Sequence, residues 1–294
     1  MAKTNRFKTL LALLLSGASL PLAAETIYEA KSLYRNILVY EQHGIRCMKF
    51  GIHDNGRQSC IDSEMPDRLV LEYTKLVLGG LYLNPKPQSA LIIGLGGGTL
   101  PKVFQKLYPG IKLDCVELDP AVTLVAKQFF GLVPAADTRL FDEDGRVFVK
   151  RAMRRQQQYD LIILDAFDHL YVPEHLMTKE FFEEMKSLLT PAGVLVANTY
   201  PSRKLYPLES ATYQAVFGDF YQLQQRNRII IASKQPLPNE AQLARNADLV
   251  EEKLQRFGVT KQWLLPLFTQ KVDWPSNSRM LTDQYSPANL LINQ

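Results

Sequence analysis

The amino-acid sequence predicts an α/β protein with a mostly parallel sheet, helices on both faces of that sheet, and a small antiparallel β-domain in front of it. Three observations support this prediction. Apolar strands alternate with amphipathic helices between residues 89 and 200, a glycine-rich turn follows the first of these strands, and short alternating strands with turn signals precede them. Near-continuous apolar strands separated by helices are typical of parallel sheets covered on both faces. We therefore expect ligands at the carboxyl ends of the strands.

The predicted elements fall into two parts of the chain. Residues 25–65 alternate apolar and polar positions between turn residues, which predicts an antiparallel β-domain with strands over 35–42 and 45–52. Residues 66–294 are expected to form the larger, Rossmann-like domain, which begins with a helix over 66–83. Its predicted strands span 89–95, 112–118, 138–142, 159–167 and 193–200, and its predicted helices span 100–108, 120–130, 146–153, 178–189 and 238–257.

The first 24 residues have the pattern of a secretory signal peptide. Lys3, Arg6 and Lys8 precede an apolar run that ends in small residues before Glu25. We expect cleavage near Ala24 and an exported, periplasmic protein. The alternative is an uncleaved N-terminal membrane anchor, although the run is too short for a stable membrane span. Without the three basic residues, 31 of the 34 Lys and Arg remain against 30 Asp and Glu, and the net charge falls from +4 to +1. This balance predicts no nucleic-acid surface.

The cysteines suggest one disulfide. Cys47 and Cys60 flank a segment with the turn signal Asn55-Gly56, so a hairpin would bring the two cysteines together. An exported protein can bridge such a pair, and the alternative is two unrelated thiols. Cys115 lies in an apolar strand pattern and is expected to be a buried thiol.

Four glycines form the turn after the first strand of the larger domain. The stretch "ALIIGLGGGTLPKV" places Gly94, Gly96, Gly97 and Gly98 between a strand and a helix. Glycine lets the backbone approach a ligand closely and adopts positive φ angles. The order of strand, turn and helix predicts a nucleotide-like ligand at this turn, and the alternative is a tight connection alone.

Acidic residues end the next two strands. Glu117 lies 19 residues after the last glycine of the turn, where a carboxylate can accept hydrogen bonds from two ribose hydroxyls. This spacing alone does not exclude a dinucleotide. In "FDEDGRVF", Asp144 and Gly145 suit an adenine amino group, because the acid can accept a hydrogen bond and the glycine leaves room. Asp142 and Glu143 are equally acidic alternatives, and a simple turn is another.

The fourth strand ends in residues suited to catalysis. In "LDAFDHLYVPEHL", Asp165 and Asp168 can hold a cation, and one of them can act as a general base. The alternative is a helix cap plus a loop acid. Tyr171 lies on the same loop, together with two histidines and Glu174. The chain has no Cys and His spacing typical of zinc and no Gly-x-Ser-x-Gly elbow, so we expect neither a metal site nor a serine hydrolase.

At these residues the chain resembles the spermidine synthase (polyamine aminopropyltransferase) family, the spermidine-synthase-like branch of the class I S-adenosylmethionine-dependent methyltransferase fold. The likeness extends from about residue 34 to residue 233, and "LTDQYSPANLL" resembles the C-terminal segment of spermidine-synthase-like members. Its most specific part is "YDLIILDAFDHLYVPEHLMTKEFF" followed by "LLTPAGVLVAN", which resembles the family's strand with paired aspartates, gate loop and helix.

The resemblance implies an enzyme that transfers an aminopropyl group from decarboxylated S-adenosylmethionine to a small-molecule amine such as putrescine, with 5′-methylthioadenosine leaving. A homodimer is one assembly that this resemblance allows. The implied site residues are Asp165 as catalytic base, Asp168 and Tyr171 for the amine, Gln58 and Glu117 for the nucleoside, and Asp144 with Gly145 for the adenine.

Three positions depart from the family pattern. Gly97 stands where the family has an aspartate that favours the decarboxylated donor, the segment 71–74 replaces a Tyr-His-Glu-Met motif, and Asn198 replaces a frequent glutamine. Since an acid at position 97 would repel a donor carboxylate, its absence leaves ordinary S-adenosylmethionine as an alternative donor. Two further functions therefore stay open: an S-adenosylmethionine-dependent methyltransferase, and a non-catalytic exported protein that binds nucleosides or polyamines.

Overall fold

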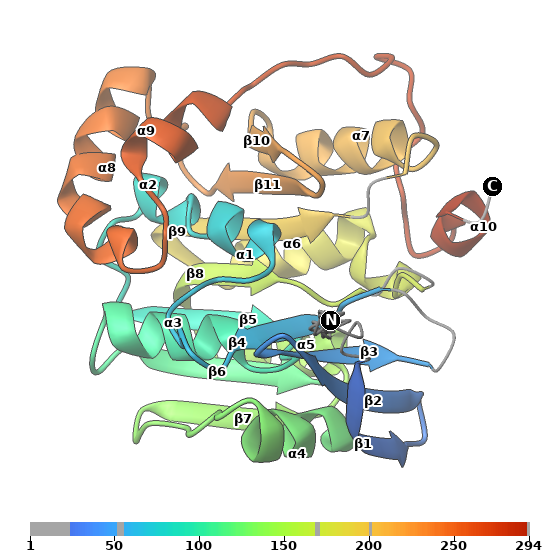
Figure 1. Ribbon diagram of the computed structural model, residues 1–294. Helices are drawn as coiled ribbons and strands as arrows, with labels where there is room; N and C mark the ends of the chain where they lie inside the picture. The colour runs from blue at the N-terminus through green and yellow to red at the C-terminus, as the bar shows by residue number, and fades with distance from the viewer. Residues whose placement is uncertain (1–23, 52–55, 168–170, 200–201, 293–294) are drawn as a thin grey trace, which may run out of the picture.

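The computed structural model describes residues 24–51, 56–167, 171–199 and 202–292 of the chain (Figure 1). The predicted signal peptide and Asp168 lie outside the described residues, apart from Ala24 at the end of the former. Two sheets form the frame: a four-stranded antiparallel sheet near the N-terminus and a seven-stranded sheet. The predicted fold class, an antiparallel β-unit followed by a Rossmann-like α/β unit, is confirmed.

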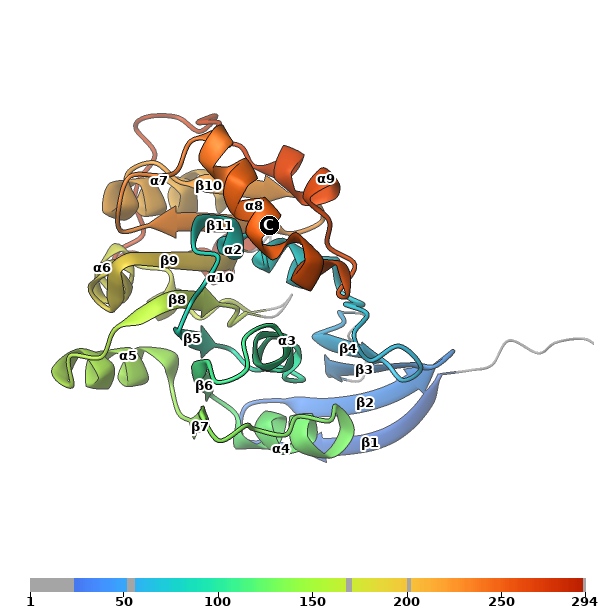
Figure 2. The same cartoon turned by 90° about the vertical axis from the view of Figure 1, so that its left-hand side faces the viewer.

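The N-terminal sheet has its strands in sequence order. They are β1 (Glu25–Lys31), β2 (Asn36–Gln42), β3 (Ile45–Phe50) and β4 (Ser59–Asp62). Its buried side chains Ile37, Val39 and Met48 pack against Val122 and Val125 of α4 (Pro120–Phe129). Both views of the molecule show α4 beside this sheet (Figures 1 and 2). The small sheet is therefore anchored on the larger unit by a shared apolar core.

The large sheet has the strand order β10-β11-β9-β8-β5-β6-β7, in which β5 to β9 run parallel and β11 runs antiparallel to both of its neighbours, β9 and β10. We did not predict β10 and β11 as strands; they make the sheet mixed at one edge. The large-sheet strands are β5 (Ser89–Ile93), β6 (Lys112–Glu117), β7 (Thr138–Asp142), β8 (Tyr159–Leu164), β9 (Leu189–Thr199), β10 (Tyr221–Gln224) and β11 (Arg228–Ser233).

Alternate residues of each central strand point to opposite faces, as the two-residue period of a strand requires. Ala90 and Ile92 of β5 belong to one apolar core, and Leu91 and Ile93 to the other. The first core is covered by α1 (Glu72–Val77), α2 (Gly80–Leu83), α3 (Thr99–Leu107) and α8 (Glu240–Gln255), and the second by α5 (Gly145–Arg154), α6 (Lys179–Ser187) and α7 (Tyr206–Phe217).

The predicted helix over 66–83 is wrong in its first part. The side chain of Asp62 accepts hydrogen bonds from the amides of Glu64 and Met65, which holds a turn after β4. Leu71 has extended backbone angles, so α1 begins only at residue 72, and a break at residues 78 and 79 separates it from α2. Residues 70–73 are thereby brought to the wall of the cavity described below.

The C-terminal segment returns to the outer edge of the large unit. It contains α9 (Lys261–Leu264), the 3-10 turn η2 (Leu265–Leu267) and α10 (Ala288–Ile292), while the 3-10 turn η1 (Glu174–Leu176) lies after β8. Asn289 exchanges two 2.9 Å hydrogen bonds with the backbone of Val172, and Asp283 accepts a pair from Arg146. The tail thus fixes the segment that follows β8. In the described residues, no helix is long and apolar enough to cross a membrane.

Candidate active site

A cavity of about 790 Å³ lies at the carboxyl ends of β5, β6 and β8, between the large sheet and the N-terminal sheet. Its size is within the range of small-molecule sites in proteins. The predicted residues Gln58, Gly94, Gly96, Glu117, Asp144, Gly145, Asp165 and Tyr171 line it, whereas Gly97 and Gly98 form the turn just behind.

The glycine turn is shaped by close approach to its neighbours. Gly94 has a φ of +95°, and a Cβ atom there would lie 2.0 Å from the carbonyl oxygen of Asp165. Gly96 and Gly98 also have positive φ values, of +52° and +71°. Because side chains rarely adopt this backbone and have no space here, glycine is required at these positions.

Gly97 donates its backbone N–H to the Oγ of Ser59 at 2.7 Å. A Cβ atom at Gly97 would lie 2.9 Å from both the Cβ of Ser59 and the Cδ1 of Phe130. The space that a side chain would need at this position is therefore taken by Ser59 and Phe130. This gives a physical reason for the missing aspartate.

Glu117 ends β6 and turns back onto the glycine turn. Its carboxylate accepts hydrogen bonds from the amides of Leu95 at 3.0 Å and Asp119 at 3.1 Å. Burial raises the pKa of Glu117, although these hydrogen bonds and the charge of Arg35 act in the opposite direction. The acid is therefore held rigidly beside the turn, at the edge of the cavity.

Asp144 has two roles in the structure. Its Oδ1 accepts the amides of Arg146 and Val147 as the N-cap of α5, and its Oδ2 lies 2.7 Å from the Nε2 of His175. The hydrogen bond to His175 is the main cause that lowers the pKa of Asp144. Gly145 leaves no room for a side chain, because a Cβ atom would lie 2.6 Å from Ile93. An adenine amino group at Asp144 would have to share that carboxylate with His175.

Asp165 follows β8 at the base of the cavity. Its Oδ2 accepts the phenol of Tyr73 and its Oδ1 accepts the amide of Asn198, both at 2.9 Å. Asn198 is itself held by Asn227. Burial raises the pKa of Asp165, whereas the hydrogen bonds from Asn198 and Tyr73 lower it. Burial also raises the pKa of Tyr73, so the phenol stays protonated and is the donor.

Two further predicted residues line the same cavity, and one cannot be placed. Gln58 and Tyr171 lie in the cavity wall, and Asp168 is outside the described residues. Tyr73 and Asn198 were not predicted as site residues, although both stand at positions that depart from the family pattern. Arg226, which lines the cavity from the turn between β10 and β11, was not predicted either. Within the described ranges, no group of three or more His, Cys, Asp or Glu side chains is placed to hold a metal ion.

Comparison with known proteins identifies the family of this chain. A model of the spermine/spermidine synthase domain matches residues 72–217. A polyamine aminopropyltransferase of Vibrio vulnificus is 45% identical over 271 residues, which cover 90% of this chain and 91% of that protein. The chain belongs to the spermine/spermidine synthase family. The predicted family and the predicted aminopropyltransferase class of enzyme are therefore confirmed.

Solved structures share the fold. The spermidine synthase of Thermotoga maritima matches with a TM-score of 0.63 at 19% identity, over 84% of this chain and 85% of that chain. Human methyltransferase-like protein 13, solved in complex with SAH, matches with a TM-score of 0.58 at 25% identity, over 70% of this chain and 96% of that chain. The fold of this chain is thus found in both a spermidine synthase and a methyltransferase-like protein.

Proposed function

We propose that this protein transfers an aminopropyl group from decarboxylated S-adenosylmethionine to an amine of a polyamine such as putrescine. The observation that carries the proposal is the pairing of two strand-end acids in one cavity. Glu117 ends β6 beside the glycine turn, and Asp165 follows β8 on the other side of Gly94. In this proposal Glu117 binds a ribose and Asp165 binds the reacting amine.

In this proposal the donor lies across the carboxyl ends of the strands. Glu117 accepts hydrogen bonds from the ribose hydroxyls, Gly94 and Gly96 let the backbone approach the nucleoside, and Asp144 accepts the adenine amino group. Gln58 helps to position the nucleoside from the N-terminal sheet. Gly145 lines the cavity beside Asp144.

Asp165 acts on the acceptor amine. Amines of this class are mostly protonated near pH 7, so a carboxylate first attracts the cation and then removes its proton. The free amine attacks the donor carbon, a C–N bond forms as the C–S bond breaks, and the electron pair goes to sulfur in 5′-methylthioadenosine. Tyr73 and Asn198 hold the two oxygens of Asp165 during this step, while Tyr171 and Asp168 are proposed to line the acceptor site.

The direct test is to incubate the purified protein with putrescine and with each of the two donors, and to identify the products by mass spectrometry. We expect spermidine and 5′-methylthioadenosine from the decarboxylated donor. Absence of any aminopropylated amine across a panel of diamines and polyamines would reject the proposal.

A second candidate is a transferase that uses S-adenosylmethionine itself. Gly97 favours it, because position 97 has no acid to repel the donor carboxylate. The same incubation separates the two candidates, since a methylated amine with S-adenosylhomocysteine would replace spermidine with 5′-methylthioadenosine.

We also propose that the mature protein is exported and begins near Glu25. The disulfide between Cys47 and Cys60 supports this proposal, because disulfides persist mainly in oxidising compartments. The intact mass of the protein from a periplasmic extract tests it. A full-length product confined to the cytoplasm would contradict the proposal.

A further inference from the structure

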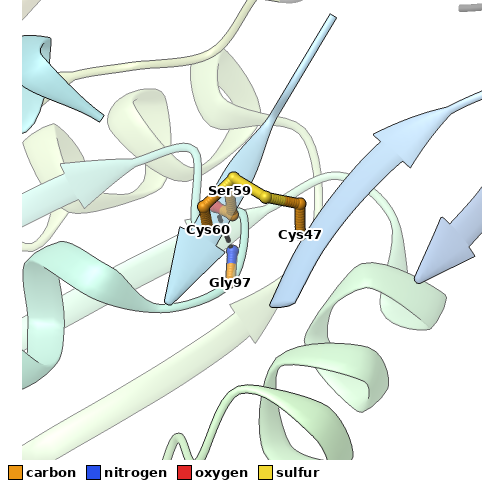
Figure 3. Close-up of a disulfide and its surroundings, with 4 residues drawn as sticks. All are labelled: Cys47, Ser59, Cys60 and Gly97. Atoms are coloured by element: carbon orange, nitrogen blue, oxygen red, sulfur yellow. Dashed lines mark hydrogen bonds between the residues drawn. A yellow bond between two sulfur atoms is a disulfide. The ribbon is translucent and has the colours of Figure 1, made fainter. Parts of the chain in front are cut away.

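A disulfide lies next to the residue that holds the glycine turn. Cys47 of β3 and Cys60 of β4 are paired in register, with their Cα atoms 4.1 Å apart, and are joined through their sulfur atoms. Ser59 precedes Cys60, is buried, and accepts the backbone N–H of Gly97 through its Oγ at 2.7 Å. Figure 3 shows the disulfide, Ser59 and Gly97 side by side, with this hydrogen bond dashed.

Ser59 also fits closely against the turn. A Cβ atom at Gly96 would lie 2.7 Å from the Oγ of Ser59, and one at Gly97 would lie 2.9 Å from its Cβ. Ser59 and the glycine turn are therefore in close van der Waals contact, with no free space between them. Because packed interiors transmit such displacements, a shift of β4 has to move the turn or break the hydrogen bond.

The disulfide adds a covalent link to a short edge strand. β4 has four residues and lies at the edge of the N-terminal sheet, where it pairs with β3 alone. The disulfide closes the loop from residue 47 to residue 60, and residues 56–59 of this loop line the cavity. A covalent link between β3 and β4 thus restrains one wall of the donor site.

We propose that Ser59 is a positioning residue for the donor and that the Cys47–Cys60 disulfide keeps it against the glycine turn, so that donor affinity depends on the redox state of the pair. The proposal rests on the proposed function for the identity of the donor. Reduction by a dithiol breaks the S–S bond and gives two thiols; the reductant supplies two electrons and two protons and becomes a disulfide itself.

The test compares four proteins: wild type, Ser59→Ala, the double variant Cys47→Ser with Cys60→Ser, and Cys115→Ala as the matched control. Cys115 is the buried free thiol of β6 and has no part in the disulfide. Each protein is examined with and without a dithiol. Hydrogen exchange reports protection of the Gly97 amide in the ligand-free protein, and calorimetry gives the Kd of the donor and of 5′-methylthioadenosine. Thiol titration verifies reduction, and circular dichroism verifies folding.

We expect Ser59→Ala to lower protection of the Gly97 amide and to raise the donor Kd about fivefold, as loss of one buried hydrogen bond predicts. Reduced wild type and the double variant should show at least the same weakening, whereas Cys115→Ala should match the wild type in both redox states. The KM for the acceptor should change by less than twofold, which a general loss of structure would not produce.

Two results would overturn the proposal. One is unchanged Gly97 protection and donor Kd in Ser59→Ala, which keeps its disulfide and so does not depend on folding of a reduced chain. The other is unchanged values in wild type after thiol titration shows the bond to be cleaved. If oxidised wild type binds no adenosyl compound, the proposed function fails, and exchange at the Gly97 amide alone then decides the link between the disulfide and the turn.

Discussion

The phenol of Tyr73 donates a hydrogen bond to Asp165 across the base of the cavity, at 2.9 Å. Asn198 donates to the other carboxylate oxygen at the same distance. Both oxygens are therefore oriented before any substrate arrives. Such preorganisation matters for a base, because proton transfer requires the carboxylate to lie within hydrogen-bond reach of the reacting amine.

Replacing Asp165 with asparagine should lower kcat by about 10²–10⁴-fold, the usual contribution of a general base. Donor affinity should stay near the wild-type value, because the proposed contacts to the nucleoside come from Glu117 and the glycine turn. Steady-state kinetics and calorimetry measure the two effects. Asp142→Asn is the control, since Asp142 is an exposed acid at the end of β7 and does not line the cavity. Near-normal turnover in Asp165→Asn would show that another group is the base.

Tyr73→Phe should move the acidic limb of the pH–kcat profile to higher pH. The Tyr73 hydrogen bond stabilises the carboxylate and lowers the pKa of Asp165, so its loss adds to the rise that burial causes. A base is active when ionised; hence activity should appear at a higher pH, by roughly one unit. Tyr108→Phe is the control, because the Tyr108 phenol donates to the carbonyl of Pro85, away from the cavity. An unmoved limb would contradict this role for Tyr73.

The strand-end acids could be predicted because they follow from local patterns. Apolar runs mark the strands, parallel strands end at the same edge of the sheet, and Glu117 and Asp165 follow two such runs. The partners of Asp165 could not be predicted this way. Tyr73 lies 92 residues from it and Asn198 lies 33 residues away, so their meeting depends on the extended segment before α1 and on the register of β8 and β9.

The dependence on long-range contacts also explains why two other features could not be predicted from the sequence. The helix pattern over 66–83 is periodic, but the turn held by Asp62 delays the start of α1. The sequence shows that glycine replaces the family's aspartate at position 97. It does not show that Ser59 of β4 and Phe130 occupy the space that a side chain there would need. Long-range packing, which a single sequence does not display, decides both features.

Glu117→Ala should weaken binding of the donor and of 5′-methylthioadenosine by about 100-fold. The substitution removes the proposed hydrogen bonds to the ribose, each worth roughly 1.5–3 kcal/mol for a charged group, and leaves the amide of Leu95 without its acceptor. Calorimetry measures the change. Asp142→Ala, whose Cα pairs with that of Glu117 in the sheet, is the matched control and should bind normally. Equal affinity in Glu117→Ala and the wild type would remove Glu117 from the donor site.

Asn289 connects the C-terminal segment to the wall of the cavity. Its side chain accepts a hydrogen bond from the backbone N–H of Val172 and donates one to the carbonyl of the same residue, both at 2.9 Å. The backbone N–H of Asn289 donates to the carboxylate of Glu174 at 2.8 Å. The neighbouring residues Tyr171 and His175 line the cavity. Asn289 of the C-terminal segment therefore supports the wall residues through hydrogen bonds, without lining the cavity itself.

Asn289→Ala should leave both backbone groups of Val172 without their partner, at a cost of about 1–3 kcal/mol for each buried group. We expect faster exchange of the Val172 amide and a KM for the acceptor raised up to roughly tenfold. The change in kcat should be smaller, because Asp165 and its two partners lie on other elements. Gln284→Ala is the control, since Gln284 is an exposed residue of the same tail. If the Val172 amide stays protected and both KM values match the wild type, the tail has no positioning role at this wall.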